Sequence, residues 1–290
     1  MSSRSRLLGK AHLLEQPAPG VATRLEAYYT RYYRDTLAIP GWRDLVRVRL
    51  DDAAYEGQRL ARLERALGRP VAGLALLNCG CGTGGFNVAA GRAGAIAWGA
   101  DVDPEAVAIA RARLGAARVV RAPAESLPFR SAAFDVVYCF STLEHVADAA
   151  RALAEMARVL RPGGALYVHT PSPAACFETH YKVLWIPGLP RPFARAYLAA
   201  RGRPAAFLST LRLVSAGECL RALEAAGMRS IRVLGGDADR AVGGPLWPAI
   251  RLYYRLFRVR PSLELLAIRG QALHQQLHQQ LPGPPPVNAP

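Results

Sequence analysis

Lysine is almost absent from this chain of 290 residues. Only Lys10 and Lys182 are lysines, so arginine supplies nearly all of the basic side chains, which number 37 against 22 acidic ones and give a formal net charge of +15. A basic surplus can indicate binding to nucleic acid or to an anionic membrane surface. Because the arginines are spread along the chain, we favour a compositional bias and leave an anionic partner open.

Two further absences narrow the class of protein. No run of about 18 or more apolar residues occurs, so the sequence predicts no membrane-spanning helix. The first residues contain no apolar secretory core, and we therefore expect a cytoplasmic protein. The five cysteines are odd in number, and Cys79 and Cys81 lie too close together for a zinc knuckle. The sequence thus predicts neither disulfides nor a metal site.

A glycine-rich motif is the most informative feature that is present. An apolar run ends in Cys-Gly-Cys-Gly-Thr-Gly-Gly at residues 79–85, with Gly80, Gly82 and Gly84 at alternate positions. Such a run typically ends a strand and turns into a helix, and its glycines let backbone N–H groups approach an anionic ligand. About twenty residues later a second predicted strand ends at Asp101, whose carboxylate can accept both hydroxyls of a ribose. The dinucleotide-binding pattern fits these residues equally well, so they leave the cofactor open.

Four blocks follow the glycine motif in order: Ala-Glu-Ser-Leu-Pro-Phe at 124–129, Phe-Asp-Val-Val-Tyr at 134–138, Leu-Glu-His-Val at 143–146 and Val-Leu-Arg-Pro-Gly-Gly at 159–164. With the motif, they resemble the class I S-adenosylmethionine-dependent methyltransferases, and within them the small-molecule enzymes that include the quinone-biosynthesis methyltransferases. The resemblance implies an α/β fold with a Rossmann-like seven-stranded sheet and helices on both faces. It also implies S-adenosylmethionine as the cofactor.

The resemblance and the apolar periodicity together divide the chain. We expect an N-terminal helical extension or lid at 1–67, the S-adenosylmethionine-binding domain at 68–270, a substrate-covering insertion at 171–212 after the fifth strand, and a disordered, low-complexity tail at 271–290. Strands are predicted near 74–79, 95–101, 118–121, 135–140, 164–170, 230–234 and 262–268, the last one antiparallel. Helices are predicted over 22–37, 44–67, 84–93, 104–114, 147–160, 215–227 and 247–258.

The resemblance assigns residues to the cofactor site. The methionine and ribose portions should be lined by Gly80, Cys81, Gly82 and Gly84. Asp101 should bind the ribose hydroxyls, and Val102 should pack on the adenine. The edge of the adenine should meet Ala124 and Glu125, and the transferable methyl should face Phe140 and Ser141.

Two positions depart from the family pattern. Asn78 stands where the family usually has an acidic residue, and Pro123 stands where relatives often place an aspartate against the adenine amine. Asn78 can still accept a hydrogen bond in the cofactor site, but it carries no charge to pair with the cofactor ammonium. Pro123 has neither a carboxylate nor an N–H. A non-catalytic, methyltransferase-like scaffold is therefore an alternative function.

The catalytic candidates are His145, His180 and Tyr181. Methyl transfer is an in-line displacement, so the protein must hold the nucleophile close to the methyl group and aligned with the C–S bond. In quinone-type O-methyltransferases a pair equivalent to Glu144-His145 lies near the substrate, where a histidine can take a hydroxyl proton. In the insertion, His180 or Tyr181 could be a base or a substrate contact. Helix capping and ordinary surface roles are the alternatives.

We expect the acceptor to be a small molecule that is lipid-like, aromatic or sugar-containing, methylated on a hydroxyl oxygen. The apolar residues 183–187 and the arginines of the insertion suit such an acceptor or a peripheral contact with an anionic membrane surface. A nucleic-acid methyltransferase is disfavoured, because residues 139–142 read Cys-Phe-Ser-Thr in place of an Asn/Asp-Pro-Pro-aromatic motif. A nicotinamide oxidoreductase would explain the glycines and Asp101 but not the later blocks.

Overall fold

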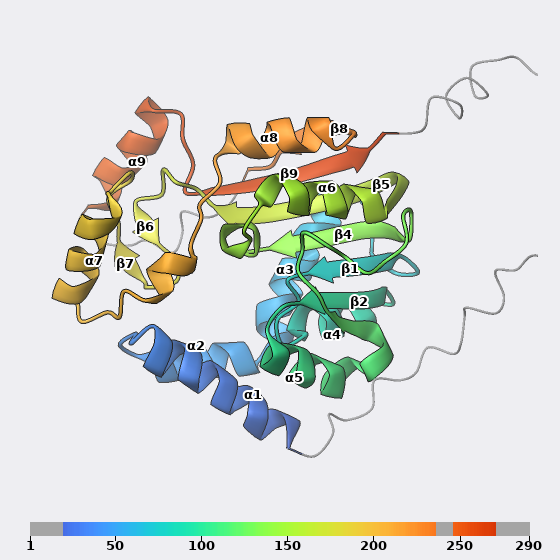
Figure 1. The fold of residues 1–290 in the computed structure, drawn as a ribbon, viewed down its shortest axis with the longest axis horizontal. Helices are drawn as coiled ribbons and strands as arrows, with labels where there is room; N and C mark the ends of the chain where they lie inside the picture. The colour runs from blue at the N-terminus through green and yellow to red at the C-terminus, as the bar shows by residue number, and fades with distance from the viewer. Residues whose placement is uncertain (1–19, 236–245, 271–290) are drawn as a thin grey trace, which may run out of the picture.

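The computed structural model describes residues 20–235 and 246–270, arranged around a seven-stranded sheet (Figure 1). The strand order is β3-β2-β1-β4-β5-β9-β8. The strands are β1 (Ala75–Cys79), β2 (Ile96–Asp101), β3 (Val119–Arg121), β4 (Phe134–Phe140), β5 (Leu160–Pro171), β8 (Met228–Val233) and β9 (Ser262–Arg269). The predicted Rossmann-like α/β fold is confirmed, and the strands coincide closely with the predicted ranges.

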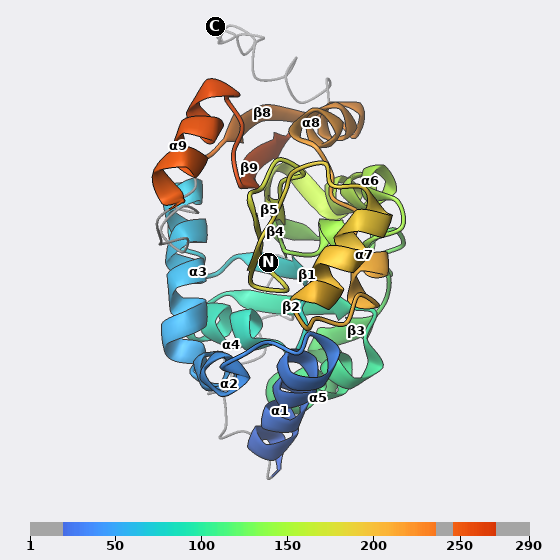
Figure 2. The same ribbon diagram turned by 90° about the vertical axis from the view of Figure 1, so that its left-hand side faces the viewer.

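Parallel pairing runs from β3 across the sheet to β5, and β9 is antiparallel to both of its neighbours, as predicted. The strands are joined by α4 (Gly85–Arg92), α5 (Pro104–Leu114) and α6 (Ala149–Val159), and α8 (Ala216–Ala225) precedes β8. Because side chains alternate along a strand, Leu76 of β1 packs toward α4 and toward α3 (Asp52–Leu67) of the N-terminal extension, whereas Leu77 packs toward α6 and α8. Figure 2 shows these helix pairs on opposite faces of the sheet.

The N-terminal extension is helical, but it is divided more finely than the apolar period indicates. It consists of α1 (Val21–Thr30), a π-helical turn (Arg31–Thr36), α2 (Trp42–Leu50) and α3 (Asp52–Leu67). Asp51 separates the last two helices, because its side chain accepts a hydrogen bond from the backbone N–H of Ala54 and so starts α3. The predicted single helix over 44–67 is therefore wrong at this position.

The insertion forms a separate cluster at one end of the molecule (Figure 1). It contains a short hairpin of β6 (Phe177–Glu178) and β7 (Val183–Leu184), then α7 (Arg191–Ala200) and a 3₁₀ turn (Phe207–Thr210). Leu37 and Ile39 of the N-terminal extension pack with Tyr181 and Leu198 of the insertion. These two predicted additions therefore pack against each other, and both contribute residues to the lining of one cavity.

α9 (Trp247–Leu256) lies at the same end of the molecule as the insertion (Figures 1 and 2). None of the helices in the described ranges is both long and apolar enough to cross a membrane. The predicted disordered tail at 271–290 and the first 19 residues lie outside the described residues.

Candidate active site

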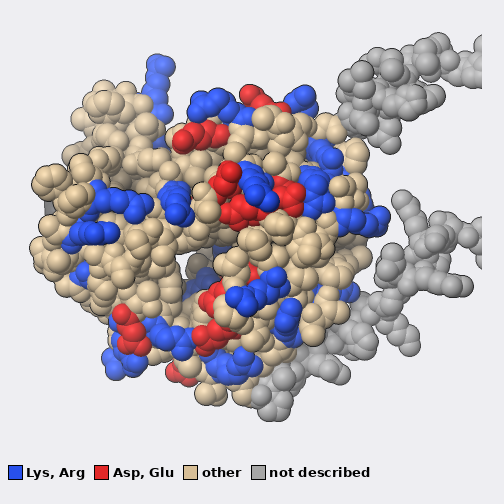
Figure 3. Space-filling view, in the orientation of Figure 1, with Lys and Arg blue, Asp and Glu red and all other residues tan. Residues whose placement is uncertain are grey.

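A cavity of about 1070 Å³ lies at the carboxyl ends of β1, β2 and β4, where open α/β sheets bind their ligands. The hollow is visible near the middle of the face drawn in Figure 3. Twelve of the residues predicted to form the site line this cavity: Asn78, Gly80, Cys81, Gly82, Asp101, Val102, Ala124, Glu125, Phe140, Ser141, His145 and His180. The roles assigned to them remain predictions.

Gly80 is required by close packing at the end of β1. Its φ is +79°, and a Cβ added to it would overlap the side chain of Thr142. The backbone N–H groups of Gly80 and Cys81 donate to Ala100 O at 2.8 and 3.0 Å. The loop is therefore tied to the end of β2, next to Asp101.

Asp101 organises the same loop from the opposite side. Its carboxylate accepts hydrogen bonds from the backbone N–H groups of Gly82 (2.7 Å) and Asp103 (3.0 Å). Burial raises the pKa of Asp101, while these hydrogen bonds act in the opposite direction. Each carboxylate oxygen can accept more than one hydrogen bond, so both can still accept ribose hydroxyls.

Asn78 is buried and belongs to a chain of amides that sequence reasoning missed. Its Nδ2 donates to Asn87 Oδ1 at 2.7 Å, and Asn87 Nδ2 donates to Trp98 O at 2.8 Å. The chain of hydrogen bonds leaves Oδ1 of Asn78 as the acceptor for a ligand. The available sequence signal was a polar residue among the apolar positions of α4.

Two predicted site residues lie outside the cavity lining. Gly84 begins α4 with a φ of +80°, and an added Cβ would press on Ala110 and Leu114 of α5, so this glycine serves helix packing. Tyr181 is fully buried in the insertion, where its hydroxyl donates to Pro204 O at 2.9 Å. Neither residue reaches the cavity.

At the predicted adenine end of the cavity, Val102 is exposed and the carboxylate of Glu125 already accepts hydrogen bonds from the protein backbone. Val102 is 58% exposed and lines the cavity. Glu125 Oε1 accepts hydrogen bonds from the backbone N–H groups of Ala147 (2.8 Å) and Asp148 (3.3 Å), at the start of α6. Pro123 also lines the cavity. Glu125 therefore orients the loop before α6 as well as facing the cavity.

Tyrosines of the N-terminal extension hydrogen-bond to the glycine loop and to the end of β2. The hydroxyl of Tyr28 donates to Asp103 Oδ2 at 2.9 Å, and the hydroxyl of Tyr29 lies 2.8 Å from Thr83 Oγ1. Arg49 Nη2 donates to Tyr29 at 2.7 Å. Burial and Asp103 raise the pKa of Tyr28, so its hydroxyl stays protonated and can donate. The four tyrosines at positions 28, 29, 32 and 33, which recur at helical spacing in the sequence, all line the cavity.

A buried arginine pair in the cavity wall was not foreseen. Arg49 and Arg59 pair with the buried Glu56 at 3.7 and 2.9 Å, and the guanidinium of Arg59 lies 3.7 Å from the ring centre of Phe140. The Nε atoms of both arginines are buried without a hydrogen-bond partner among the described residues. Arginine is so abundant in this sequence that the pair gave no local signal.

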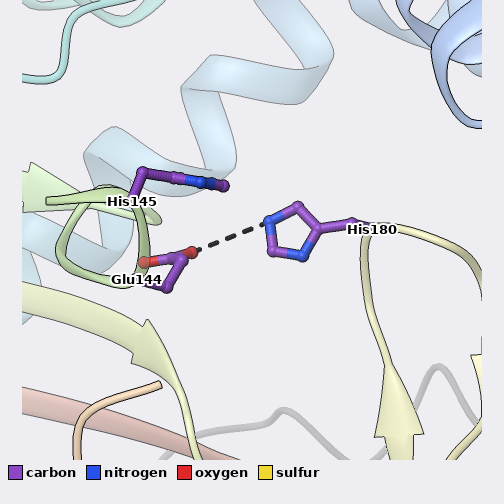
Figure 4. Close-up of side chains that lie close together, drawn as sticks. All are labelled: Glu144, His145 and His180. Atoms are coloured by element: carbon purple, nitrogen blue, oxygen red, sulfur yellow. Dashed lines mark ion pairs between the residues drawn. The ribbon is translucent and has the colours of Figure 1, made fainter. Parts of the chain in front are cut away.

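His145 and His180 line the cavity, and the fully buried Glu144 lies next to them (Figure 4). The imidazole rings of His145 and His180 lie 5.2 Å apart at their centres. Glu144 Oε2 accepts a hydrogen bond from Thr170 Oγ1 at 3.0 Å, and its Oε1 lies 3.8 Å from His180 Nε2. Burial raises the pKa of Glu144 to about 7, and partial burial next to His180 lowers that of His145 to about 4. The structure thus unites two catalytic candidates from separate segments.

The geometry agrees with the comparison to known families. Residues 77–168 match a family model described as a methyltransferase domain. These residues are a methyltransferase domain. The resemblance carried by the glycine motif and the ordered blocks is therefore confirmed, and the methyltransferase domain counts against the nicotinamide oxidoreductase.

Curated relatives of this methyltransferase-domain protein match part of its length. It is 35% identical over 129 residues to a ubiquinone biosynthesis O-methyltransferase of Rhizobium rhizogenes, covering 41% of this chain and 52% of the relative. It is 40% identical over 116 residues to a probable S-adenosylmethionine-dependent methyltransferase of Mycolicibacterium smegmatis, covering 40% of this chain and 42% of the relative. The chain spans about half the length of the curated relatives it matches.

Solved structures share the fold of the methyltransferase-domain protein. Geranyl diphosphate C-methyltransferase of Streptomyces coelicolor A3(2) has a TM-score of 0.52 at 18% identity, covering 88% of this chain and 100% of that chain. Phosphoethanolamine N-methyltransferase 2 of Haemonchus contortus has a TM-score of 0.51 at 19% identity, covering 74% of this chain and 53% of that chain. These likenesses concern the fold alone.

Proposed function

We propose that this protein transfers the methyl group of S-adenosylmethionine to a hydroxyl oxygen of a small molecule. The observation that carries the proposal is one cavity that joins the glycine loop and Asp101 to His145 and His180. Its volume of about 1070 Å³ is slightly above the range of roughly 300–1,000 Å³ for pockets that hold one ligand. Cofactor and acceptor therefore have room to bind side by side.

The cofactor occupies the end of the cavity at the glycine loop. Asp101 accepts the ribose hydroxyls, Val102 packs on the adenine, and Asn78 Oδ1 accepts a hydrogen bond from the cofactor ammonium. Phe140 ends β4, Ser141 follows it, and both line the same cavity as the glycine loop and the two histidines. Bound there, the cofactor would supply the methyl group, and Phe140 and Ser141 would face it.

The acceptor occupies the end of the cavity at the insertion. Aromatic side chains line this part, among them Tyr32, Phe177, Phe207 and Trp247, and they favour an apolar or aromatic acceptor. The acceptor oxygen attacks the methyl carbon while the C–S bond breaks and its electron pair passes to sulfur. The hydroxyl proton must leave, and we assign this step to the cluster of Glu144, His145 and His180.

A peripheral contact with an anionic membrane surface is part of the proposal. Large apolar side chains are exposed on α9 and near α7, and arginines lie beside them in the sequence. The exposed apolar residues are Leu252, Leu256, Phe257, Ile186 and Phe193. Apolar and cationic side chains on one surface favour the interface of an anionic bilayer. A lipid-like acceptor could then enter from the membrane.

Calorimetric titration of the purified chain with S-adenosylmethionine, S-adenosylhomocysteine and NAD tests the cofactor assignment. We expect micromolar binding of the two sulfur compounds and none of NAD. Replacement Asp101→Ala should weaken binding by about 1–3 kcal/mol, because it removes charge-assisted hydrogen bonds. Asp135→Asn is the matched control, since Asp135 also accepts a backbone N–H, that of Ala75, but lies at the opposite end of the strands.

The outcomes separate the two functions that the sequence left open. Binding that depends on Asp101, followed by turnover of cofactor with a hydroxylated acceptor, supports the methyltransferase. A folded protein that binds neither sulfur compound, alone or with acceptor mixtures, supports the non-catalytic scaffold. In that case replacement of Asn78 by Asp tests whether the missing charge is responsible.

A further inference from the structure

Three potential metal ligands converge where the proposed acceptor site ends: His145 and His180 line the cavity, and Glu144 is buried beside them. The ligand atoms of Glu144, His145 and His180 all lie within 4.8 Å of one another, and no other such group of three occurs in residues 20–235 and 246–270. Glu144 and His145 come from the 3₁₀ turn at Leu143–His145, whereas His180 comes from the loop between β6 and β7. Figure 4 shows His180 approaching the other two from the opposite side.

Glu178 determines which nitrogen of His180 is free. Its Oε1 lies 2.8 Å from His180 Nδ1, and its Oε2 accepts a hydrogen bond from the backbone N–H of Tyr181 at 2.6 Å. A carboxylate oxygen accepts hydrogen bonds, so in this contact Nδ1 is the donor and carries the proton. In the neutral ring Nε2 then has an unshared electron pair. This is the arrangement in which a carboxylate orients a metal-binding histidine.

The free nitrogen of His180 faces a carboxylate oxygen that has no hydrogen bond. Glu144 is fully buried, and its Oε1 has no hydrogen-bond partner within the described part of the chain. His180 Nε2 lies 3.8 Å from this oxygen, which is too far for an N–H···O hydrogen bond. Leaving such an oxygen unsatisfied is costly. A cation held between the two atoms would satisfy both.

We propose that Glu144, His145 and His180 bind one divalent first-row transition-metal ion, such as Zn²⁺, Mn²⁺ or Fe²⁺. Two imidazole nitrogens and one carboxylate oxygen suit these ions, whereas Mg²⁺ and Ca²⁺ prefer sites made of oxygen ligands. Bonds from such an ion to nitrogen or oxygen are about 2.0–2.2 Å long, so atoms separated by 3.8 Å can share one ion. Glu178 acts as a positioning residue for His180.

The ion would keep coordination positions open toward the cavity. A hydroxyl oxygen bound there loses its proton more readily, because the ion stabilises the negative oxygen. The proton passes to a water molecule, and the oxygen then attacks the methyl carbon of the cofactor. This consequence rests on the proposed function. Binding of the ion does not, and it can be tested without cofactor or acceptor.

The test is calorimetric titration of the full chain, stripped of metal with a chelator, with Zn²⁺, Mn²⁺ and Mg²⁺. We expect one transition-metal ion per chain and much weaker binding of Mg²⁺. Glu144→Gln and His180→Asn should each lower the affinity at least about tenfold. Glu178→Gln keeps all three ligands. If this variant loses about tenfold or more in affinity for the ion, the carboxylate of Glu178 orients His180 for binding. The absorption spectrum of bound Co²⁺ gives an independent readout of the ligand set.

His274 and His278, outside the described residues, provide the decisive control. They are four residues apart in the sequence and could bind metal by themselves. The double variant His274→Asn/His278→Asn should bind the ion as the unaltered chain does. Loss of binding in this variant, unchanged binding in Glu144→Gln, or no binding to the unaltered chain would each overturn the proposal. Should Glu144→Gln fail to fold, as judged by circular dichroism, His145→Asn takes its place.

The titrations keep the two proposals apart. Ion binding that needs Glu144 and His180, in a protein that binds no S-adenosylmethionine, supports the metal site and contradicts the methyltransferase. Cofactor binding and turnover that persist after complete metal removal, with no ion bound in any titration, support the methyltransferase and contradict the metal site.

Discussion

At the scale of single residues, Gly80 and Gly82 are glycines for different reasons. Both have positive φ values, +79° and +51°, so alanine at either position is strained. A side chain at Gly80 would also overlap Thr142, whereas nothing lies within 4 Å of a Cβ at Gly82. The alternate glycines of one motif therefore meet two separate requirements, which only the packing distinguishes.

We predict that Gly80→Ala lowers the free energy of unfolding much more than Gly82→Ala does. The left-handed conformation costs an L-residue about 1–2 kcal/mol in both variants. Overpacking against Thr142 should add roughly 1–3 kcal/mol for Gly80→Ala alone. Urea unfolding without cofactor measures the difference. Thr142→Gly should restore part of the loss in the Gly80→Ala background; equal losses in the two single variants would contradict the steric explanation.

His169 allows a prediction about pH. Its ring stacks on Phe140 at 4.1 Å, and burial together with Arg59 and Arg62 lowers its pKa from 6.5 to about 3. Between these values the unfolded chain binds a proton at this histidine and the folded chain does not. The contribution of His169 to stability is therefore present above pH 6.5 and is lost as the pH falls toward 3.

The variant His169→Phe should remove this pH dependence while keeping an aromatic ring on Phe140. The free energy of unfolding of the variant minus that of the original chain should rise by on the order of 2 kcal/mol when the pH is lowered from 7.5 to 4.5. Urea unfolding of both proteins at the two pH values measures the gain. Other titrating groups, such as Glu144, contribute equally in both proteins and so cancel in the comparison. If the two proteins differ in free energy of unfolding by the same amount at both pH values, the explanation is contradicted.

At the scale of elements, α1 is held to the methyltransferase domain by tyrosine hydroxyls in addition to apolar packing on α5. Tyr28 and Tyr29 hydrogen-bond to Asp103 and Thr83, whereas no hydrogen bond of the Tyr32 hydroxyl occurs among the described residues. Leu25 and the ring of Tyr29 also pack in one cluster with Ile109 of α5, so the hydroxyls affect how firmly α1 docks more than whether it forms. The lid role of residues 1–67 depends on this docking and remains a prediction.

We predict that the double variant Tyr28→Phe/Tyr29→Phe increases amide hydrogen exchange in Val21–Thr30. Each hydrogen bond contributes about 0.5–1.5 kcal/mol, so opening of α1 should become roughly tenfold more frequent. Tyr32→Phe is the matched control and should leave the exchange rates unchanged. Hydrogen exchange followed by mass spectrometry measures both. Equal exchange in the double variant and the control would show that ring packing alone docks the helix.

The sequence predicted most elements of the sheet domain because their signals are local. The proline and the acidic cap at the start of α5, for example, lie side by side in the chain. The insertion was predicted only as an irregular segment. Its hairpin and α7 are stabilised by Leu37 and Ile39, which are distant in the sequence, so no local pattern could reveal them.

At the scale of the whole molecule, the basic surplus and the exposed apolar residues of α9 predict binding to anionic vesicles. Arg251, Arg255 and Arg258 are exposed beside Leu256 and Phe257. Figure 3 shows Lys and Arg side chains scattered over an otherwise uncharged surface at the end that carries α7. Binding should weaken as salt is raised, because ions screen exposed charges.

We expect sedimentation with vesicles of mixed anionic and neutral lipid, and much less with neutral lipid alone. The double variant Leu256→Ser/Phe257→Ser should lower the partition coefficient at least about tenfold, because each large apolar side chain contributes roughly 1.5–3 kcal/mol when buried. Val48→Ser, an exposed residue of α2, is the matched control and should change little. Equal partition of all three proteins would contradict a contact through α9.

What the sequence by itself determined is the methyltransferase fold and the residues of the glycine loop and of β2 that line one end of the cavity. Both depend on short stretches, such as the glycine loop and the strand that ends at Asp101, in which neighbouring residues act together. The tertiary structure alone decided that Tyr181 is buried, that Arg49 and Arg59 line the cavity, and that His180 faces Glu144. These contacts join segments far apart in the chain, and their positions depend on how the insertion packs against the N-terminal extension.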